Sequence, residues 1–174
     1  FMLLKIIGLI LLTASCTGYG YYKSMEYRRR LEQVQELRKI IFLLSGEIAC
    51  RKTPLAEACQ MLAARSEKPY GNWLWTLYAS MTRDKKIPFC KIWEEAAEQL
   101  FTSISLPEAE QNELKRLGKK LGSSDGKMQE QALNWYGTQL EELESAYRMT
   151  LAEKQKLCRS LGILAGLFLA VLFI

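Results

Sequence analysis

Residues 23–50 read KSMEYRRRLEQVQELRKIIFLLSGEIAC, and this stretch decides the fold. Apolar side chains recur in it every three or four positions, while charged or amide side chains fill most of the other face. This spacing predicts one long amphipathic helix, because it gathers the apolar side chains on one side. The apolar positions are Tyr27, Leu31, Val34, Leu37, Ile41, Leu44 and Ile48.

The sequence after this helix predicts further helices, joined by short polar breaks. Thr53 suits the N-cap of the next helix and Pro54 its first position, and Ser105 with Glu108 matches a capping box. No window alternates as a strand would. The sequence therefore predicts an all-α fold, a bundle of about six helices. Apart from the long helix, these are expected at residues 54–65, 73–81, 88–100, 107–121 and from about 125 to the C-terminal segment.

Charge is distributed very unevenly along the 174 residues, which carry 24 Lys and Arg, 19 Asp and Glu, and a formal net charge of +5. Residues 1–22 contain one charged side chain, Lys5, and residues 160–174 contain none. Apolar segments of this kind are long enough to cross a bilayer at about 1.5 Å per helical residue. We expect membrane helices at 1–22 and 157–174, flanking a helical domain at 23–156. A buried core helix is the alternative for the C-terminal segment.

The basic residues beside these segments predict their orientation. Lys23 and Arg28–Arg30 follow the first segment, and Lys154, Lys156 and Arg159 precede residues 160–174, the uncharged part of the second. Positive flanks mark the cytoplasmic side, so the middle domain is expected in the cytoplasm and both termini outside. A bacterial lipobox at Leu12–Cys16 is the competing interpretation, and it would export the residues after Cys16.

Small residues recur at four-residue spacing in both expected membrane helices. Such residues let helices approach closely in lipid, so they predict packing between the two segments or with a partner. The alternative is that glycine is simply common in membrane helices. The positions are Ala14 and Gly18 in the first segment and Gly162, Gly166 and Ala170 in the second.

The composition argues against an enzyme. The chain has no histidine, which excludes Ser-His-Asp and Cys-His nucleophiles, and it has no glycine-rich phosphate loop. Its five cysteines show no paired spacing, which predicts free thiols rather than a metal site or disulfides. Basic residues are dispersed, and the Arg28–Arg30 cluster suits anionic membrane headgroups. We therefore expect no catalytic residue, cofactor, metal, nucleic acid or small-molecule substrate.

The run Leu117-Gly-Lys-Lys-Leu-Gly-Ser-Ser-Asp125, continuing to Gln129, resembles the L-G-x-x-L-G-x-S-D-x-x-x-Q stretch of the stage III sporulation protein AB family. Further pieces fit in order over essentially the whole chain, among them the basic start at Tyr27–Arg30 and the segment Thr53–Ala58. The family-motif residues, expected to have a structural or a partner-binding role, are Leu117, Gly118, Leu121, Gly122, Ser124, Asp125 and Gln129.

This resemblance implies a component of the mother-cell to forespore channel of endospore-forming bacteria. The family is similar to the cytoplasmic domains of the inner-membrane platform protein of type II secretion and type IV pilus machines. The implied partners are a secretion-type ATPase (stage III sporulation protein AA), other membrane proteins of the stage III sporulation A operon, and membrane lipid. The implied location is the mother-cell membrane around the forespore. The alternative from another class is a membrane-anchored regulatory or dimerising scaffold without an ATPase partner.

Overall fold

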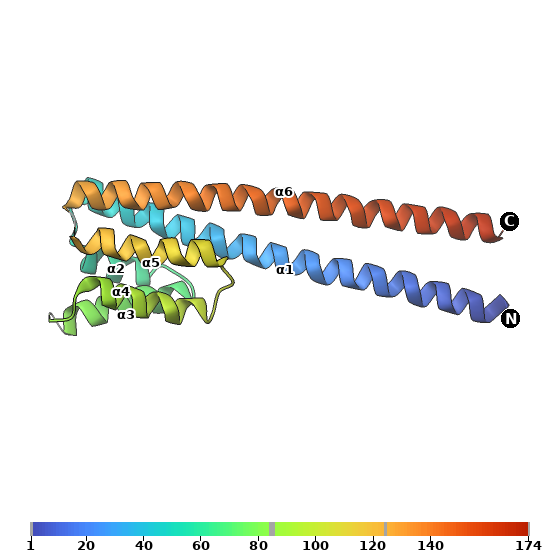
Figure 1. Ribbon diagram of the computed structural model, residues 1–174, viewed down its shortest axis with the longest axis horizontal. Coiled ribbons are helices and arrows are strands. Elements are labelled where there is room, and N and C mark those ends of the chain that lie inside the picture. Colours follow the sequence, from blue (N-terminus) through green and yellow to red (C-terminus); the bar gives the residue numbers. More distant parts are fainter. Residues whose placement is uncertain (1, 84–85, 124, 174) are drawn as a thin grey trace. The chain divides into compact units, whose positions relative to one another are not determined.

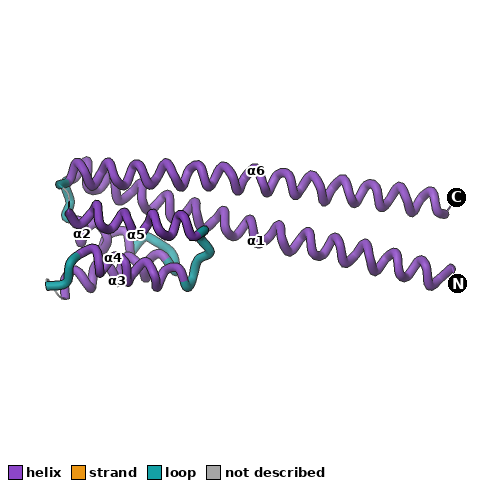
Figure 2. The backbone as a smooth tube through the Cα atoms, in the orientation of Figure 1, coloured by secondary structure: helices purple, strands orange, loops and turns teal. Residues whose placement is uncertain are grey.

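The computed structural model describes residues 2–83, 86–123 and 125–173, and in this part of the chain it contains six α-helices and no strand (Figures 1 and 2). Side chains are described only in part for residues 1–20 and 158–174. The prediction of an all-helical fold with about six helices is confirmed. The helices are α1 (Met2–Arg51), α2 (Leu55–Ala63), α3 (Tyr70–Arg83), α4 (Phe89–Phe101), α5 (Glu108–Ser123) and α6 (Gly126–Phe173).

The chain divides into two compact units by packing. Unit 1 comprises residues 1–31 and 145–174, and unit 2 comprises residues 32–144. Helices α1 and α6 each contribute to both units. The boundaries expected after residue 22 and before residue 157 rest on hydropathy and not on packing, so this division does not test them and they remain predictions.

The helices of the described part of the chain were compared with the requirements of a membrane span. No helix in the described part of the chain combines the length and the apolar character needed to cross a membrane. Of the two segments expected to do so, 1–22 and 157–174, the described residues 2–22 and 157–173 lie within the long helices α1 and α6. The confirmed part of the fold prediction is therefore the helical bundle.

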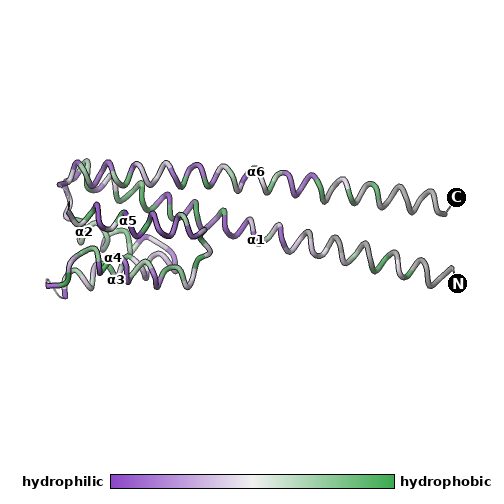
Figure 3. Tube along the Cα trace, in the orientation of Figure 1, coloured by the Kyte–Doolittle hydropathy of each residue, from purple (hydrophilic) through white to green (hydrophobic). Residues whose placement is uncertain are grey.

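The apolar stripe of α1 forms part of the core, as the sequence predicts. Of its seven positions, all except the half-buried Tyr27 are buried. Hydrophobic and hydrophilic residues alternate along the helices of unit 2, which is the pattern of helices with one buried face (Figure 3). The largest side chains enclosed in this unit are Trp93 and Tyr136.

Two predicted helix caps are wrong. Helix α2 begins at Leu55 with Pro54 at the N-cap position, and no side-chain hydrogen bond caps it. The residue before the break, Lys52, has φ 51°, a left-handed conformation that ends α1 and that glycine usually provides. At α5, the first helical residue is Glu108, so Ser105 lies too far upstream to cap it.

Ser105 has a different role, because it helps to fix a loop on α1. Its backbone N–H donates to Oε1 of Gln33 at 3.0 Å. The hydroxyl of Tyr70 donates to the backbone carbonyl of Gln33 at 2.6 Å. A single residue of α1 therefore binds both α3 and the connection between α4 and α5.

In unit 1 the two helical segments lie side by side, and Figure 1 places both termini at the same end of this unit. The rings of Tyr27 and Tyr147 meet edge to face with centroids 6.4 Å apart. The ammonium group of Lys154 lies 3.8 Å from the centroid of the Tyr27 ring. Aromatic and cation–π contacts of this kind add to the apolar packing between the two segments.

Candidate functional site

The family motif lies at a corner of unit 2, where α5 ends and α6 begins. Leu117 and Leu121 are buried, as their spacing on one face of α5 requires. Gly118 and Gly122 are each one position further along the same helix. The two leucines therefore belong to the core, and the glycines face the neighbouring helix α4.

The two glycines allow α4 and α5 to approach closely. A Cβ atom added at Gly118 would lie 2.2 Å from Cδ1 of Trp93, and one added at Gly122 would lie 3.0 Å from Cδ1 of Phe89. The first distance is far below van der Waals contact, so a side chain at 118 would force Trp93 to move. The indole N–H of Trp93 also donates to the carbonyl of Leu114 at 2.7 Å, within the buried interface.

The polar residues of the motif satisfy the ends of two helices. Oδ1 of Asp125 accepts a hydrogen bond from the backbone N–H of Met128 at 3.0 Å, which caps the start of α6. The side-chain amide of Gln129 donates to the carbonyl of Leu121 at 2.7 Å, near the end of α5. The amide of Met128 and the carbonyl of Leu121 would otherwise need water or another partner, because the first amides and the last carbonyls of a helix have no partner within that helix.

The described motif residues thus have structural roles in the chain's own fold. Leu117 and Leu121 fill the core, and Gly118 and Gly122 leave room for two aromatic rings. Asp125 caps α6, and Gln129 joins α6 to α5. Ser124 lies outside the described residues. Whether any of them also contacts a partner stays a prediction.

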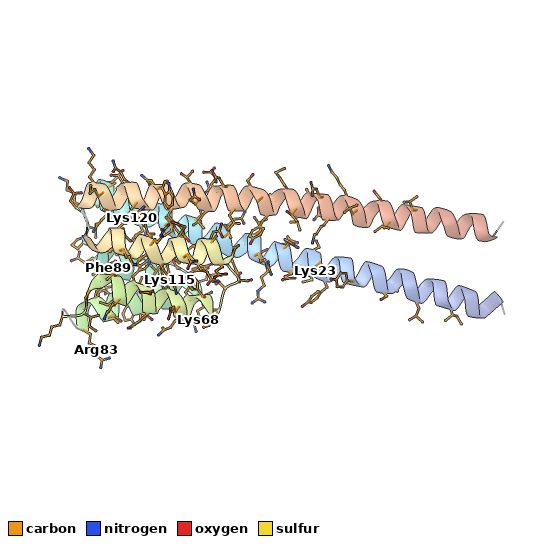
Figure 4. The ribbon with its side chains drawn as sticks, viewed as in Figure 1. Lys23, Lys68, Arg83, Phe89, Lys115 and Lys120 are labelled. Atoms are coloured by element: carbon orange, nitrogen blue, oxygen red, sulfur yellow. The ribbon has the colours of Figure 1, made fainter. Side chains whose placement is uncertain are left out.

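An open groove of about 740 Å³ runs over α5 beside this corner. Glu94 of α4 and Trp135 of α6 line its two sides, and Glu113 and Arg116 lie on α5 between them. Trp135 is 46% exposed, and the ammonium group of Lys120 lies 4.6 Å from the centroid of its ring. Figure 4 labels Lys115 and Lys120 on α5, with Phe89 nearby. The groove presents an aromatic ring among charges of both signs.

Sequence periodicity did not identify a partly buried polar cluster between α1 and α6 in unit 2. The carboxylate of Glu144, with a side chain 9% exposed, accepts hydrogen bonds from Arg38 at 2.7 Å and from Gln35 at 3.0 Å. The hydrogen bond that Arg38 donates to Glu144 is the largest of the effects that raise the pKa of Arg38, and the charges of Glu141 and Glu144 add to it. Glu144 follows Glu141 and Glu142 in the sequence. Its pairing across 106 residues of sequence gives no local signal.

The expected membrane-packing residues are only partly described. Ala14 and Gly18 are exposed on α1, and a Cβ atom added at Gly18 would meet nothing within 4 Å. Gly162, Gly166 and Ala170 fall outside the residues whose side chains are described. Packing at these five positions therefore stays a prediction.

Metal-binding groups and free thiols were sought among the described residues. They contain no group of three or more Cys, Asp or Glu that could hold a metal ion. Burial raises the pKa of the Cys59 thiol to about 12, which keeps it protonated and unreactive at neutral pH. The described free thiols are those of Cys50, Cys59 and Cys90.

Comparison with known proteins gives one consistent family. The family model described as stage III sporulation protein AB matches residues 5–174. Stage III sporulation protein AB of Bacillus subtilis (strain 168) is 30% identical over 173 residues, covering 98% of this chain and 99% of that protein. A solved structure of stage III sporulation protein AB (SpoIIIAB) shares the fold with a TM-score of 0.64, at 24% identity over 71% of this chain and 97% of that one.

Proposed function

The chain belongs to the stage III sporulation protein AB family, and we propose that it acts as a non-enzymatic platform or adaptor of the mother-cell to forespore channel. Membership of the family implies a role in sporulation. In the proposed role, the chain couples a cytoplasmic secretion-type ATPase, stage III sporulation protein AA, to other membrane proteins of the stage III sporulation A operon. The match over residues 5–174 is the observation that carries this proposal.

The surface of unit 2 supports a role in binding other proteins. Large apolar side chains are exposed on three of its helices, with Phe42 74% exposed on α1 and Trp75 54% exposed on α3. Met128 and Trp135 are exposed on α6. Aromatic residues are enriched in protein interfaces, so these positions are candidate contacts for the ATPase or for channel components.

We also propose that residues 1–22 and 157–174 anchor the chain in the mother-cell membrane around the forespore, with residues 23–156 in the cytoplasm. The nearly uncharged sequence of both segments supports this, and so do the basic residues that follow the first and precede the second. Both termini lie at the same end of unit 1, as an anchor of two membrane helices would require.

The test is binding between the full chain, reconstituted in lipid nanodiscs, and the purified ATPase encoded with it. The platform role predicts saturable binding and a changed rate of ATP turnover. We expect Phe42→Ser or Trp135→Ser to weaken binding about tenfold, since exposed aromatic anchors carry much of an interface's energy. Met149→Ser is the matched control, because Met149 is 64% exposed but lies in unit 1.

Two results would contradict the ATPase-coupling role. One is the absence of saturable binding by a folded, membrane-inserted chain. The other is self-assembly of the chain in the membrane while ATP turnover stays unchanged, which would favour the dimerising scaffold. Expression in growing cells before asymmetric division would contradict the sporulation platform as well.

A further inference from the structure

Basic residues outnumber acidic residues in unit 1 and not in unit 2. Unit 1 contains nine Lys and Arg residues and only two acidic residues, Glu26 and Glu153, whereas unit 2 contains 15 basic and 17 acidic residues. Unit 1 therefore has a formal net charge of +7 and unit 2 one of −2, which together give the +5 of the chain. A concentration of one sign on a small surface attracts an oppositely charged partner, whereas dispersed charges of both signs do not.

Most of these charges form a collar on two neighbouring helical segments. We define the basic collar as Lys23, Arg28, Arg29 and Arg30 of α1 with Arg148, Lys154 and Lys156 of α6. Figure 4 labels Lys23 on α1, and the ring of Tyr27, one helical turn further, contacts Lys154 of α6. The contact between Tyr27 and Lys154 places the two halves of the collar at the same level along the helices.

Side-chain contacts hold parts of the collar in place. Arg30 lies 5.9 Å from the centroid of the Tyr27 ring, on which Lys154 also lies. The carboxylate of Glu26 accepts hydrogen bonds from Arg30 at 2.6 Å and from Lys23 at 3.4 Å. The hydrogen bond from Lys23 is the largest of the effects that lower the pKa of Glu26. One acidic group thus orders two basic ones, while Arg29 and Lys156 are exposed.

The collar borders the apolar end of each helix. Because Tyr27 meets Lys154, residues 22 and 157 lie at similar heights, about 7.5 Å and about 4.5 Å beyond that contact at about 1.5 Å per residue. Tyr19, Tyr21 and Tyr22 lie at this border and are each at least 67% exposed. Tyrosines in such a position are typical of the interface between a bilayer and water, with basic residues on the cytoplasmic side.

We propose that the basic collar of unit 1 binds the headgroups of anionic phospholipids, so that the chain selects the lipids around its anchor. The inference rests on the proposed membrane anchorage and adds the class of lipid. Arg and Lys side chains donate to phosphate oxygens, and polybasic segments beside a membrane helix are attracted to anionic leaflets. The tyrosines set the depth at which the cations meet the headgroups.

The experiment reconstitutes the full chain in bilayers with a trace of spin-labelled phosphatidylglycerol or phosphatidylcholine. The motionally restricted fraction of each label gives the relative affinity of the two lipids for the chain. We expect about a threefold preference for phosphatidylglycerol at 0.15 M salt that vanishes at 1 M salt, because screening shortens the reach of surface charges.

Matched variants separate the collar from overall charge. Arg28→Gln/Arg29→Gln/Lys156→Gln is expected to abolish the preference, whereas Arg28→Lys/Arg29→Lys retains it. The control Lys68→Gln/Lys91→Gln/Lys127→Gln removes the same charge from exposed positions of unit 2 and leaves the preference unchanged.

The outcomes distinguish the collar from the anchor. Equal restricted fractions for both lipids would overturn the lipid selectivity while leaving the anchor in place. Equal loss of preference in the unit 2 control would also overturn it, because net charge alone would then be the cause. No restricted lipid at all would show that the chain does not insert, which would overturn the anchor and the inference together.

Discussion

At the scale of single residues, glycines in helices show where this chain needs space. A glycine within a helix costs about 1 kcal/mol relative to alanine, so its position needs a reason. At Gly118 the reason is Trp93, whose ring occupies the space that a Cβ atom would take. At Gly46 on α1 an added Cβ would meet nothing within 4 Å, so packing within the described chain gives no reason for that glycine.

This contrast predicts opposite effects of the same substitution. Gly118→Ala should lower the free energy of unfolding by about 1–3 kcal/mol, because the overpacked methyl group displaces Trp93. Gly46→Ala should raise it by up to about 1 kcal/mol, through the higher helix propensity of alanine. Urea unfolding of the full chain in detergent, followed by tryptophan fluorescence, measures both. Similar shifts of the same sign in the two variants would refute the steric explanation.

At the scale of elements, the corner between α5 and α6 depends on two side chains. Asp125 caps α6 through the amide of Met128, and Gln129 reaches back to the carbonyl of Leu121. The two contacts fix the connection from both sides, although it contains only a few residues. Replacing a polar residue at this corner should therefore lower stability, whereas the same replacement on an exposed helical face would be neutral.

Removing either contact should destabilise unit 2. We expect Asp125→Ala to cost about 1 kcal/mol, the usual value of an N-cap, and Gln129→Ala to cost about as much through its lost hydrogen bond. Asp125→Ser retains a capping oxygen and should remain near wild type. The neighbouring, exposed Gln131→Ala is the control. Thermal melts monitored by circular dichroism report the changes, and a neutral Asp125→Ala would contradict the capping role.

The helices themselves could be predicted from sequence, but several contacts between them could not. Apolar spacing identified the buried face of α1 because it is a local, periodic signal. The N-cap predicted at Thr53 is wrong, because Lys52 adopts a left-handed backbone conformation and the next helix starts only at Leu55. The pairing of Arg38 with Glu144 joins positions far apart in the chain, and no short motif reveals it.

At the scale of the whole molecule, the sequence predicted the charge asymmetry but not the division into units. Hydropathy marks residues 22 and 157, whereas packing separates the chain after residue 31 and again after residue 144. This second division depends on which helices meet in three dimensions. The motif at 117–129 identified the family, yet only the structure revealed that Trp93 fills the space beside Gly118.

The core of unit 2 also predicts how the stability of the molecule responds to alkaline pH. Burial, as the largest cause, raises the pKa of the Cys59 thiol to about 12 and raises the pKa values of Tyr70 and Tyr136 as well. In the unfolded chain these groups would lose protons near pH 9 for the thiol and near pH 10 for the phenols. The folded state keeps its protons longer, so its stability is complete below pH 9 and falls as pH rises towards the folded-state pKa values.

Each such group should cost about 1.4 kcal/mol of unfolding free energy per pH unit once its unfolded form ionises. Tyr136→Phe removes one of the groups and sacrifices only a long hydrogen bond, 3.4 Å from the hydroxyl to the carbonyl of Glu110. We therefore expect this variant to be within about 1 kcal/mol of wild type at pH 8 but to lose stability less steeply between pH 10 and about 11.5. Urea titrations of both full-length chains across this range measure the two slopes. Parallel curves would mean that the Tyr136 hydroxyl already ionises in the folded state, and that the core of unit 2 admits water at this position.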